Sequence, residues 1–216
     1  MQVQRNEPIR NQVARALRTA IAELRFKPGE ILIERELCEL TGASRPSVRE
    51  ALRQLESEGL VTSAAGKGTI VATVTVDEAR QLYEVRGVLE GLAGRLFTDV
   101  ATEQQRGDLT RAVDRFEAEM DTPANLLAIK DEFYRVLFEG SGNLIAHQMA
   151  ATLQRRTSLL RSTSLSTDGR PQETLTELRE ILAHMEAGDA ERVEALCRAH
   201  VAKAQEAALK RLREQE

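Results

Sequence analysis

The chain has 216 residues, of which 42% are hydrophobic and 30% charged, and its formal net charge is −4. This composition is typical of a soluble globular protein of one or two domains with a real core. Aromatic residues make up only 3% and tryptophan is absent, which favours packed helices over a β-sandwich. The sequence contains no run of 18 apolar residues and no signal peptide at its N-terminus, so we expect a cytoplasmic protein without a membrane-spanning helix.

The charge is unevenly distributed along the chain. Residues 1–74 hold 11 Lys and Arg against 9 Asp and Glu, whereas residues 75–216 hold 19 against 25. A surface that binds nucleic acid needs locally positive charge rather than a basic chain. This small asymmetry therefore places any DNA-binding surface in the first third of the chain.

The first third alternates between helical and strand patterns. Val13, Leu17 and Ile21 recur at helical spacing, the Lys-Pro-Gly at 27–29 ends that helix, and 31–33 is a short strand. The next elements are a helix over about 34–40 ended by Thr41 and Gly42, a helix from the N-cap Ser44 to about Glu58 with Gly59 behind it, and strands at 60–62 and 69–71 joined by a glycine-containing turn at 64–68. This order predicts a winged helix-turn-helix domain with a small β-wing over residues 8–74.

The helix that begins after Ser44 has two chemically different faces. Its apolar residues would pack against the two preceding helices: Val48, Ala51, Leu52 and Leu55. Its arginines fall on the opposite side at a spacing of four: Arg45, Arg49 and Arg53. Recognition helices contact bases mainly through their N-terminal residues, and an arginine can donate two hydrogen bonds to guanine. Arg45 and Arg49 are therefore candidate base contacts, although the same arginines could also form only a solvated stripe.

The residues at 27–61 carry a specific resemblance. KPG at 27–29, EREL at 34–37 and TGASRPSVREALRQLESEGLV at 41–61 resemble the GntR family of bacterial regulators. The resemblance implies a homodimer that binds a double-stranded DNA operator with an inverted repeat, and a repressor more often than an activator. Together with the free N–H groups at the start of the helix, it gives these candidate DNA-binding residues: Arg35, Ser44, Arg45, Ser47, Arg49, Gly66, Lys67 and Gly68. We expect Arg45 and Arg49 to contact bases, and Arg35 and Lys67 mainly the phosphate backbone.

The pattern is helical throughout the rest of the chain. Breaks fall near Thr102, 121–123, 140–143, 166–169 and Gly188. These breaks divide residues 77–212 into about six helices, which we interpret as an antiparallel all-helical bundle. The predicted fold class of the whole chain is therefore mainly α.

Residues 77–212 resemble the FCD domain, the all-helical effector-binding and dimerisation domain of the FadR-like branch of the GntR family. The resemblance is carried by Glu84-Val85-Arg86, Leu89-Glu90, Phe133, Leu137, Ser141-Gly142-Asn143, Gly188-Asp189 and His200. It implies that a small effector in this domain changes the affinity for the operator.

Many FCD domains hold a divalent metal through an Asp, a His four residues later and two further His. The matching positions here are Lys130, Tyr134, Leu178 and His200. One imidazole cannot make a metal site, and Asp131 is turned about 100° from the Asp position on a helix. His147 and His184 lie at loose spacing and are interpreted as surface or core residues. We therefore predict that this domain binds no metal cofactor.

The substitution of Lys130 suggests a specific hypothesis about the effector. An ammonium at this position could hold a small anion, such as an organic acid, directly, with Arg86, Tyr134 and His200 as further donors. One alternative is that Lys130 extends to solvent beside an apolar pocket. Another is that the helical domain binds no effector and only dimerises. Nothing in the sequence supports an enzyme, because it has neither a Gly-rich phosphate loop nor a Cys/His nucleophile pair.

Overall fold

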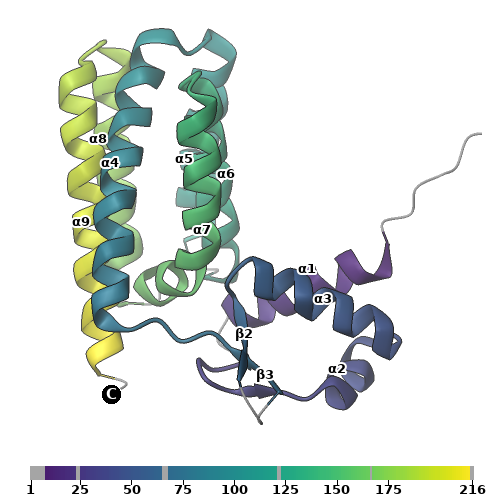
Figure 1. Cartoon of the computed structure of the whole chain (residues 1–216). Coiled ribbons are helices and arrows are strands. Elements are labelled where there is room, and N and C mark those ends of the chain that lie inside the picture. The colour runs from purple at the N-terminus through teal and green to yellow at the C-terminus, as the bar shows by residue number, and fades with distance from the viewer. Residues whose placement is uncertain (1–7, 23–24, 65–67, 121–122, 166, 215–216) are drawn as a thin grey trace, which may run out of the picture. The chain divides into compact units, whose positions relative to one another are not determined.

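The computed structural model describes residues 8–22, 25–64, 68–120, 123–165 and 167–214. The chain divides at Val74–Thr75 into two compact units, which we call the winged unit and the helical unit and describe separately (Figure 1). Within the described residues, no helix is long and apolar enough to cross a membrane.

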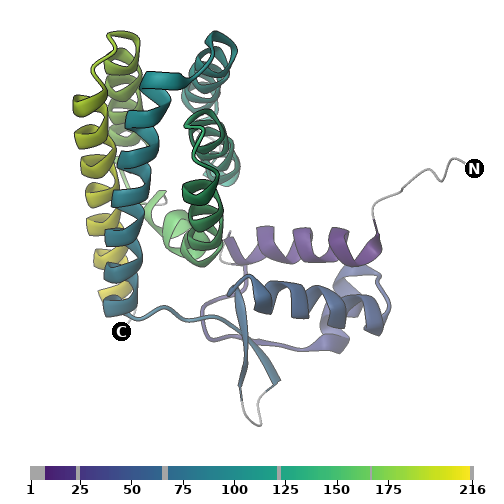
Figure 2. The ribbon, with the colours of Figure 1, turned by 45° about the horizontal axis from the view of Figure 1, so that its top comes forward.

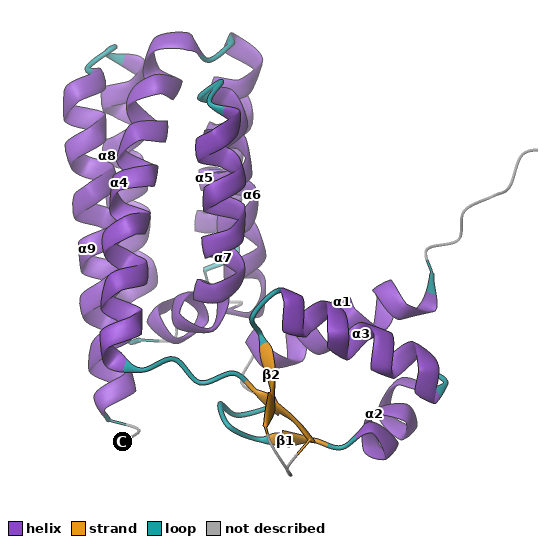
Figure 3. Ribbon diagram, viewed as in Figure 1, coloured by secondary structure: helices purple, strands orange, loops and turns teal. Residues whose placement is uncertain are grey.

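The winged unit contains three helices and a small antiparallel sheet (Figure 3). Its described elements are α1 (Ile9–Ala22), β1 (Ile31–Leu32), α2 (Glu34–Thr41), α3 (Arg45–Ser57), β2 (Val61–Ala64) and β3 (Gly68–Val71). The strands lie in the order β1-β3-β2, and Val61 pairs with Val71 across the hairpin. The predicted order of elements is confirmed, with strand ends that differ by one or two residues.

Local residues set the ends of α2 and α3. Gly42 follows α2 with a φ of 67°, in the left-handed region that glycine favours, and its N–H donates to the carbonyl of Cys38. Ser44 caps α3 by accepting a hydrogen bond from the backbone N–H of Ser47. The apolar face of α3 is buried as predicted, whereas the arginines at 45, 49 and 53 are exposed.

The helical unit consists, in its described residues, of six helices, so the predicted all-helical bundle is confirmed. They are α4 (Val76–Val100), α5 (Glu103–Ala118), α6 (Pro123–Gly140), α7 (Leu144–Leu165), α8 (Arg170–Glu186) and α9 (Ala190–Arg213). Capping explains two of the starts, because Thr102 forms a capping box with Gln105 before α5 and Asp189 caps α9.

The long helices α4 and α9 lie side by side along the helical unit (Figure 2). Their close approach depends on Gly94, because a Cβ atom there would lie 2.7 Å from Sγ of Cys197 and 3.0 Å from Cγ1 of Val193. Phe97 and Phe133 belong to the same buried apolar core. A small residue at 94 is therefore needed for the packing of the two helices.

We expect Gly94→Ala to destabilise the protein by about 1–3 kcal/mol, because overpacking against Cys197 exceeds the gain in helix propensity. Urea denaturation measures this free energy of unfolding. The matched control is Gly107→Ala in α5, where the nearest atom to the added Cβ is Nη1 of Arg111 at 3.4 Å. The control should gain up to about 1 kcal/mol, and equal effects of the two substitutions would contradict the packing argument.

Candidate functional site

The first two turns of α3 present arginines to solvent. The side chain of Arg45 is exposed and makes no hydrogen bond or ion pair with any residue that the structure describes. Ser44 and Ser47 lie at the start of the same helix, with their hydroxyl oxygens 3.0 Å apart. The N-terminus of α3 therefore offers hydroxyl and guanidinium donors at one exposed position, which is the arrangement of a recognition helix.

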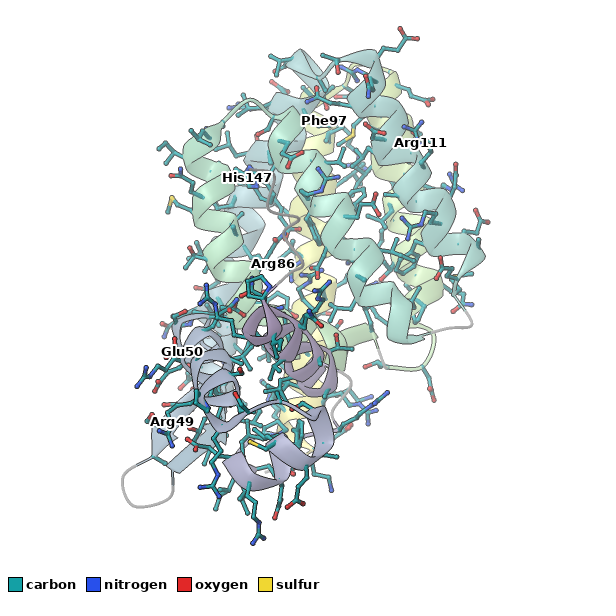
Figure 4. The ribbon with its side chains drawn as sticks, turned by 90° about the vertical axis from the view of Figure 1, so that its right-hand side faces the viewer. Arg49, Glu50, Arg86, Phe97, Arg111 and His147 are labelled. Atoms are coloured by element: carbon teal, nitrogen blue, oxygen red, sulfur yellow. The ribbon has the colours of Figure 1, made fainter. Side chains whose placement is uncertain are left out.

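Arg49 is not free in this structure. Its Nε and Nη2 donate to the two carboxylate oxygens of Glu34 on α2, at 2.9 and 2.8 Å. The hydrogen bond from Arg49 lowers the pKa of Glu34. Figure 4 labels Arg49 and its neighbour Glu50 on α3. The guanidinium edge of Arg49 that would contact guanine is thus occupied by a carboxylate. Glu34 and Arg49 are 15 residues apart, so no local sequence pattern predicts this pair.

The remaining candidate DNA-binding residues are placed as follows. Arg35 lies in the first turn of α2 with 70% of its side chain exposed, and its carboxylate neighbour Glu39 is 4.0 Å away. Gly68 begins β3 with a φ of 81°. Gly66 and Lys67 lie outside the described residues.

The helical unit buries four basic side chains. Arg86 on α4, Lys130 on α6, Arg161 on α7 and Arg170 on α8 are each at most 4% exposed. Arg86 donates to Glu90 at 2.5 Å, and Arg170 donates two hydrogen bonds to Glu177 at 2.9 Å. Arg161 donates to the exposed Asp131, through Nη1 at 2.5 Å, and has no other ion pair among the described residues. Burying a charge without a partner lowers the stability of a protein, so this cluster destabilises the fold.

The four predicted effector residues come together in this cluster. Arg86 donates to the hydroxyl of Tyr134 at 2.9 Å, and Nζ of Lys130 lies 2.9 Å from Nε2 of His200. Three cationic groups surround the Tyr134 ring, with Arg86, Lys130 and Arg161 at 5.3, 5.4 and 5.2 Å from its centroid. Lys130 is 4% exposed, so the alternative in which it extends to solvent is wrong.

A hydrogen-bonded chain orients Lys130. Nδ1 of His200 lies 2.5 Å from a carboxylate oxygen of Glu177, and hydrogen bonds from His200 and Arg170 hold the pKa of Glu177 below its usual range even though burial opposes them. Burial and the charge of Lys130 lower the pKa of His200 to about 3, so the imidazole is neutral. With its proton on Nδ1, His200 presents the lone pair of Nε2 to Lys130.

The cluster faces a cavity inside the helical unit. The cavity is partly open to solvent and has room for about one water molecule, so a larger ligand would have to move the side chains that line it. It is lined by Tyr83, Arg86, Lys130, Arg161, Ser164, Leu165, Arg170, Thr174 and Ala204. Sequence reasoning missed Tyr83, Arg161 and Arg170 here. Only Arg170 had a usable signal, because Glu177 follows it two helical turns later.

The residues present do not fit the metal of the family pattern. Both nitrogens of His200 are engaged, Nδ1 with Glu177 and Nε2 with Lys130. His147 stacks on Phe138, with ring centroids 6.4 Å apart, and does not line the cavity. In the described parts of the chain, no group of three or more His, Cys, Asp or Glu side chains could hold a metal ion.

A three-helix unit with a β-wing and an exposed arginine row on α3 defines a DNA-binding regulator of the winged helix-turn-helix class. Comparison with family models agrees: "Bacterial regulatory proteins, gntR family" matches residues 9–71, and "FCD domain" matches residues 81–203. The chain belongs to the GntR family of bacterial regulatory proteins, and its helical unit is an FCD domain.

The relatives described below are named as transcription regulators. The chain is 27% identical over 159 residues to the uncharacterised HTH-type transcriptional regulator YdhC of Bacillus subtilis, covering 72% of this chain and 71% of that protein. It is 23% identical over 202 residues to the HTH-type transcriptional repressor RspR of Escherichia coli, covering 93% and 89%. The solved structure of E. coli McbR/YncC has a TM-score of 0.76 at 22% identity, covering 97% and 99%, which shows the common fold. Family membership points to a regulator rather than an enzyme.

Glu34→Gln should strengthen binding to DNA, because it releases Arg49 and removes a carboxylate near the phosphates. We expect up to about fivefold higher affinity, the scale of an exposed ion pair, and a salt dependence steeper by up to about one unit. Fluorescence anisotropy with a labelled duplex measures both. Glu36→Gln on the same helix removes the same charge without touching Arg49, and equal gains for both variants would show that the Arg49 contact is irrelevant.

Lys130→Met should change how stability depends on pH. Burial, together with Arg86 and Arg161, lowers the pKa of Lys130 well below its usual 10.5 in the folded protein. Between the folded and unfolded pKa values, only the unfolded chain holds this proton, so the free energy of unfolding rises with pH. The slope reaches about 1.4 kcal/mol per pH unit from this residue.

The test is urea denaturation of wild type and Lys130→Met from about pH 7 to pH 10. The difference between the two curves isolates Lys130, because the other titrating groups cancel. Lys210→Met, on the exposed side of α9, serves as the control and should leave the slope unchanged. A Lys130→Met curve parallel to the wild-type curve would mean that Lys130 is charged in the folded protein over this range.

Proposed function

We propose that this protein is a homodimeric transcriptional repressor, acting in the cytoplasm, that releases an inverted-repeat operator when a small anionic effector binds in its FCD domain. The observation that carries the effector half is the cavity lined by four buried cations, of which Lys130 has no carboxylate partner among the described residues. An anion between these groups would relieve their mutual repulsion and complete their hydrogen bonds.

The DNA-binding half rests on the N-terminus of α3. Arg45 and Arg49 project from its first two turns, where recognition helices read base edges in the major groove. Arg35 and the wing residues Lys67 and Gly68 would contact the phosphate backbone. One relative is named as a repressor and another as an activator, so the choice of repression rests on the family resemblance.

The proposed mechanism is a population shift of the dimer. A ligand changes operator affinity only as far as it binds the two states of the regulator with different affinity. Anion binding would fix the positions of α4, α6, α7 and α8, since each of these helices contributes one cation to the cavity. The second candidate function is an FCD domain that only dimerises. It does not explain why basic side chains are buried around the cavity.

The test begins with selection of binding sites from a random duplex library by the full-length protein. We expect an inverted repeat, as a two-fold dimer requires. Arg45→Ala should cost about 1–3 kcal/mol of binding to the selected operator, whereas Arg53→Ala, one turn beyond Arg49, should cost less. Recovery of no shared sequence, with Arg45→Ala binding as wild type does, would contradict the DNA-binding assignment.

The effector half is tested by thermal denaturation and by anisotropy on the selected operator, with citrate, succinate, lactate and inorganic phosphate as probes. We expect at least one acid to raise the melting temperature and to lower operator affinity at least tenfold, and Lys130→Ala to abolish both effects. An unchanged response in Lys130→Ala would contradict the role of Lys130. A protein that responds to no acid would favour the dimerisation-only alternative.

A further inference from the structure

The guanidinium of Arg161 has a free edge inside the helical unit. Its Nε and Nη2 are buried and have no hydrogen-bond partner within the described part of the chain, while Nη1 donates to Asp131. Nε and Nη2 form the side-on edge that binds a carboxylate with two parallel hydrogen bonds. Arg18 and Arg49 use the same edge to hold Glu58 and Glu34. Arg161 thus lines the cavity with a carboxylate-binding edge for which the described residues supply no carboxylate.

A second set of unpaired donors faces the same cavity. Nη1 of Arg86, Nε of Arg170 and the hydroxyl of Tyr83 are buried without a partner among the described residues. Lys130 has only the lone pair of His200, which leaves its other N–H groups available. All of these residues line the cavity that Arg161 also lines, so these unpaired donors of the described residues gather at one place.

The balance of buried basic and acidic groups indicates how much negative charge a ligand at this site could carry. Arg86 and Arg170 are each matched by a buried carboxylate, Glu90 and Glu177. Lys130 has none, and Arg161 shares one nitrogen with a carboxylate that is 53% exposed. Two of the four basic groups therefore lack a buried counter-charge, and each belongs to a residue that lines the cavity. Burial lowers the pKa of Lys130, so an anion that binds beside it would bring a proton onto this amine.

From this we infer that the effector is a small dianion with two acidic groups, one seated on the Nε and Nη2 edge of Arg161 and the other between Lys130 and Nη1 of Arg86. This inference rests on the proposed function and narrows it from anions in general to doubly charged acids. A small molecule in this cavity would lie beside both positions, because Arg161, Lys130 and Arg86 all line it.

The test compares succinate with succinamate, its monoamide, which keeps the shape and removes one charge. Isothermal titration of the full-length protein should give at least tenfold tighter binding of succinate. Malonate and glutarate vary the separation of the carboxylates, and inorganic phosphate places two negative charges on one centre. Tighter binding of phosphate than of every dicarboxylate would keep the dianion but overturn the two separate positions.

Arg161→Gln removes the carboxylate-binding edge and should abolish the preference for succinate over succinamate. Arg161→Lys keeps the charge without the edge and should reduce the preference, which keeps the test valid if Arg161→Gln does not fold. The matched control is Arg156→Gln on the same helix, because the side chain of Arg156 is half exposed and does not line the cavity. The control should bind as wild type does.

The outcomes separate this inference from the proposed function. If succinamate binds as tightly as succinate and either acid releases the operator, the dianion inference is overturned while anion-controlled DNA binding stands. If no acid binds and operator affinity never changes, both fail. If succinate binds more tightly than succinamate, and only the Arg161 variants lose this preference, both the dianion inference and the proposed function are supported.

Discussion

Uncompensated positive charge inside the helical unit is the constraint on which the rest of this structure depends. Four cations from α4, α6, α7 and α8 converge on one cavity, and the fold supplies buried carboxylates for only two of them. Three of these basic groups, on Arg86, Lys130 and Arg161, lie against the Tyr134 ring. Glu177 accepts hydrogen bonds from the fourth, Arg170, and orients His200 beside Lys130. Such a cluster opposes folding, and the proposed anionic effector would supply the missing counter-charge.

Both halves of the protein use the guanidinium edge of an arginine in the same geometry but in different surroundings. On the surface, Arg49 holds Glu34, and water can solvate either group when the pair opens, so exchange of the carboxylate for DNA costs little. In the interior, the edge of Arg161 cannot be solvated by bulk water. We therefore expect the Arg49–Glu34 pair to adjust the affinity for DNA. The unpaired edge of Arg161 would instead favour a ligand that carries a carboxylate.

The sequence predicted elements that are set by local residues and missed those that depend on distant ones. Gly42, Ser44 and Thr102 act on their own helix ends, so these boundaries could be read directly. Strand ends were less accurate because they depend on pairing across the sheet, as between β1 and β3. Within the site, Lys130 and His200 were placed together through the family pattern although 70 residues separate them. Arg161 was missed because α7 also carries Arg156, and only the packing decides which arginine is buried.

The replacement of a metal ligand by Lys130 changes what the regulator requires from the cell. A metal ion must be acquired, can be removed by chelators, and makes a response depend on metal supply. The amine of Lys130 is part of the chain and is therefore present in every molecule that is synthesised. Its charge instead depends on a proton, which is always at hand but whose concentration varies with the state of the cell. If Lys130 holds the proposed effector, the response depends on acidity, because the pKa of Lys130 is lowered, and not on the supply of a metal.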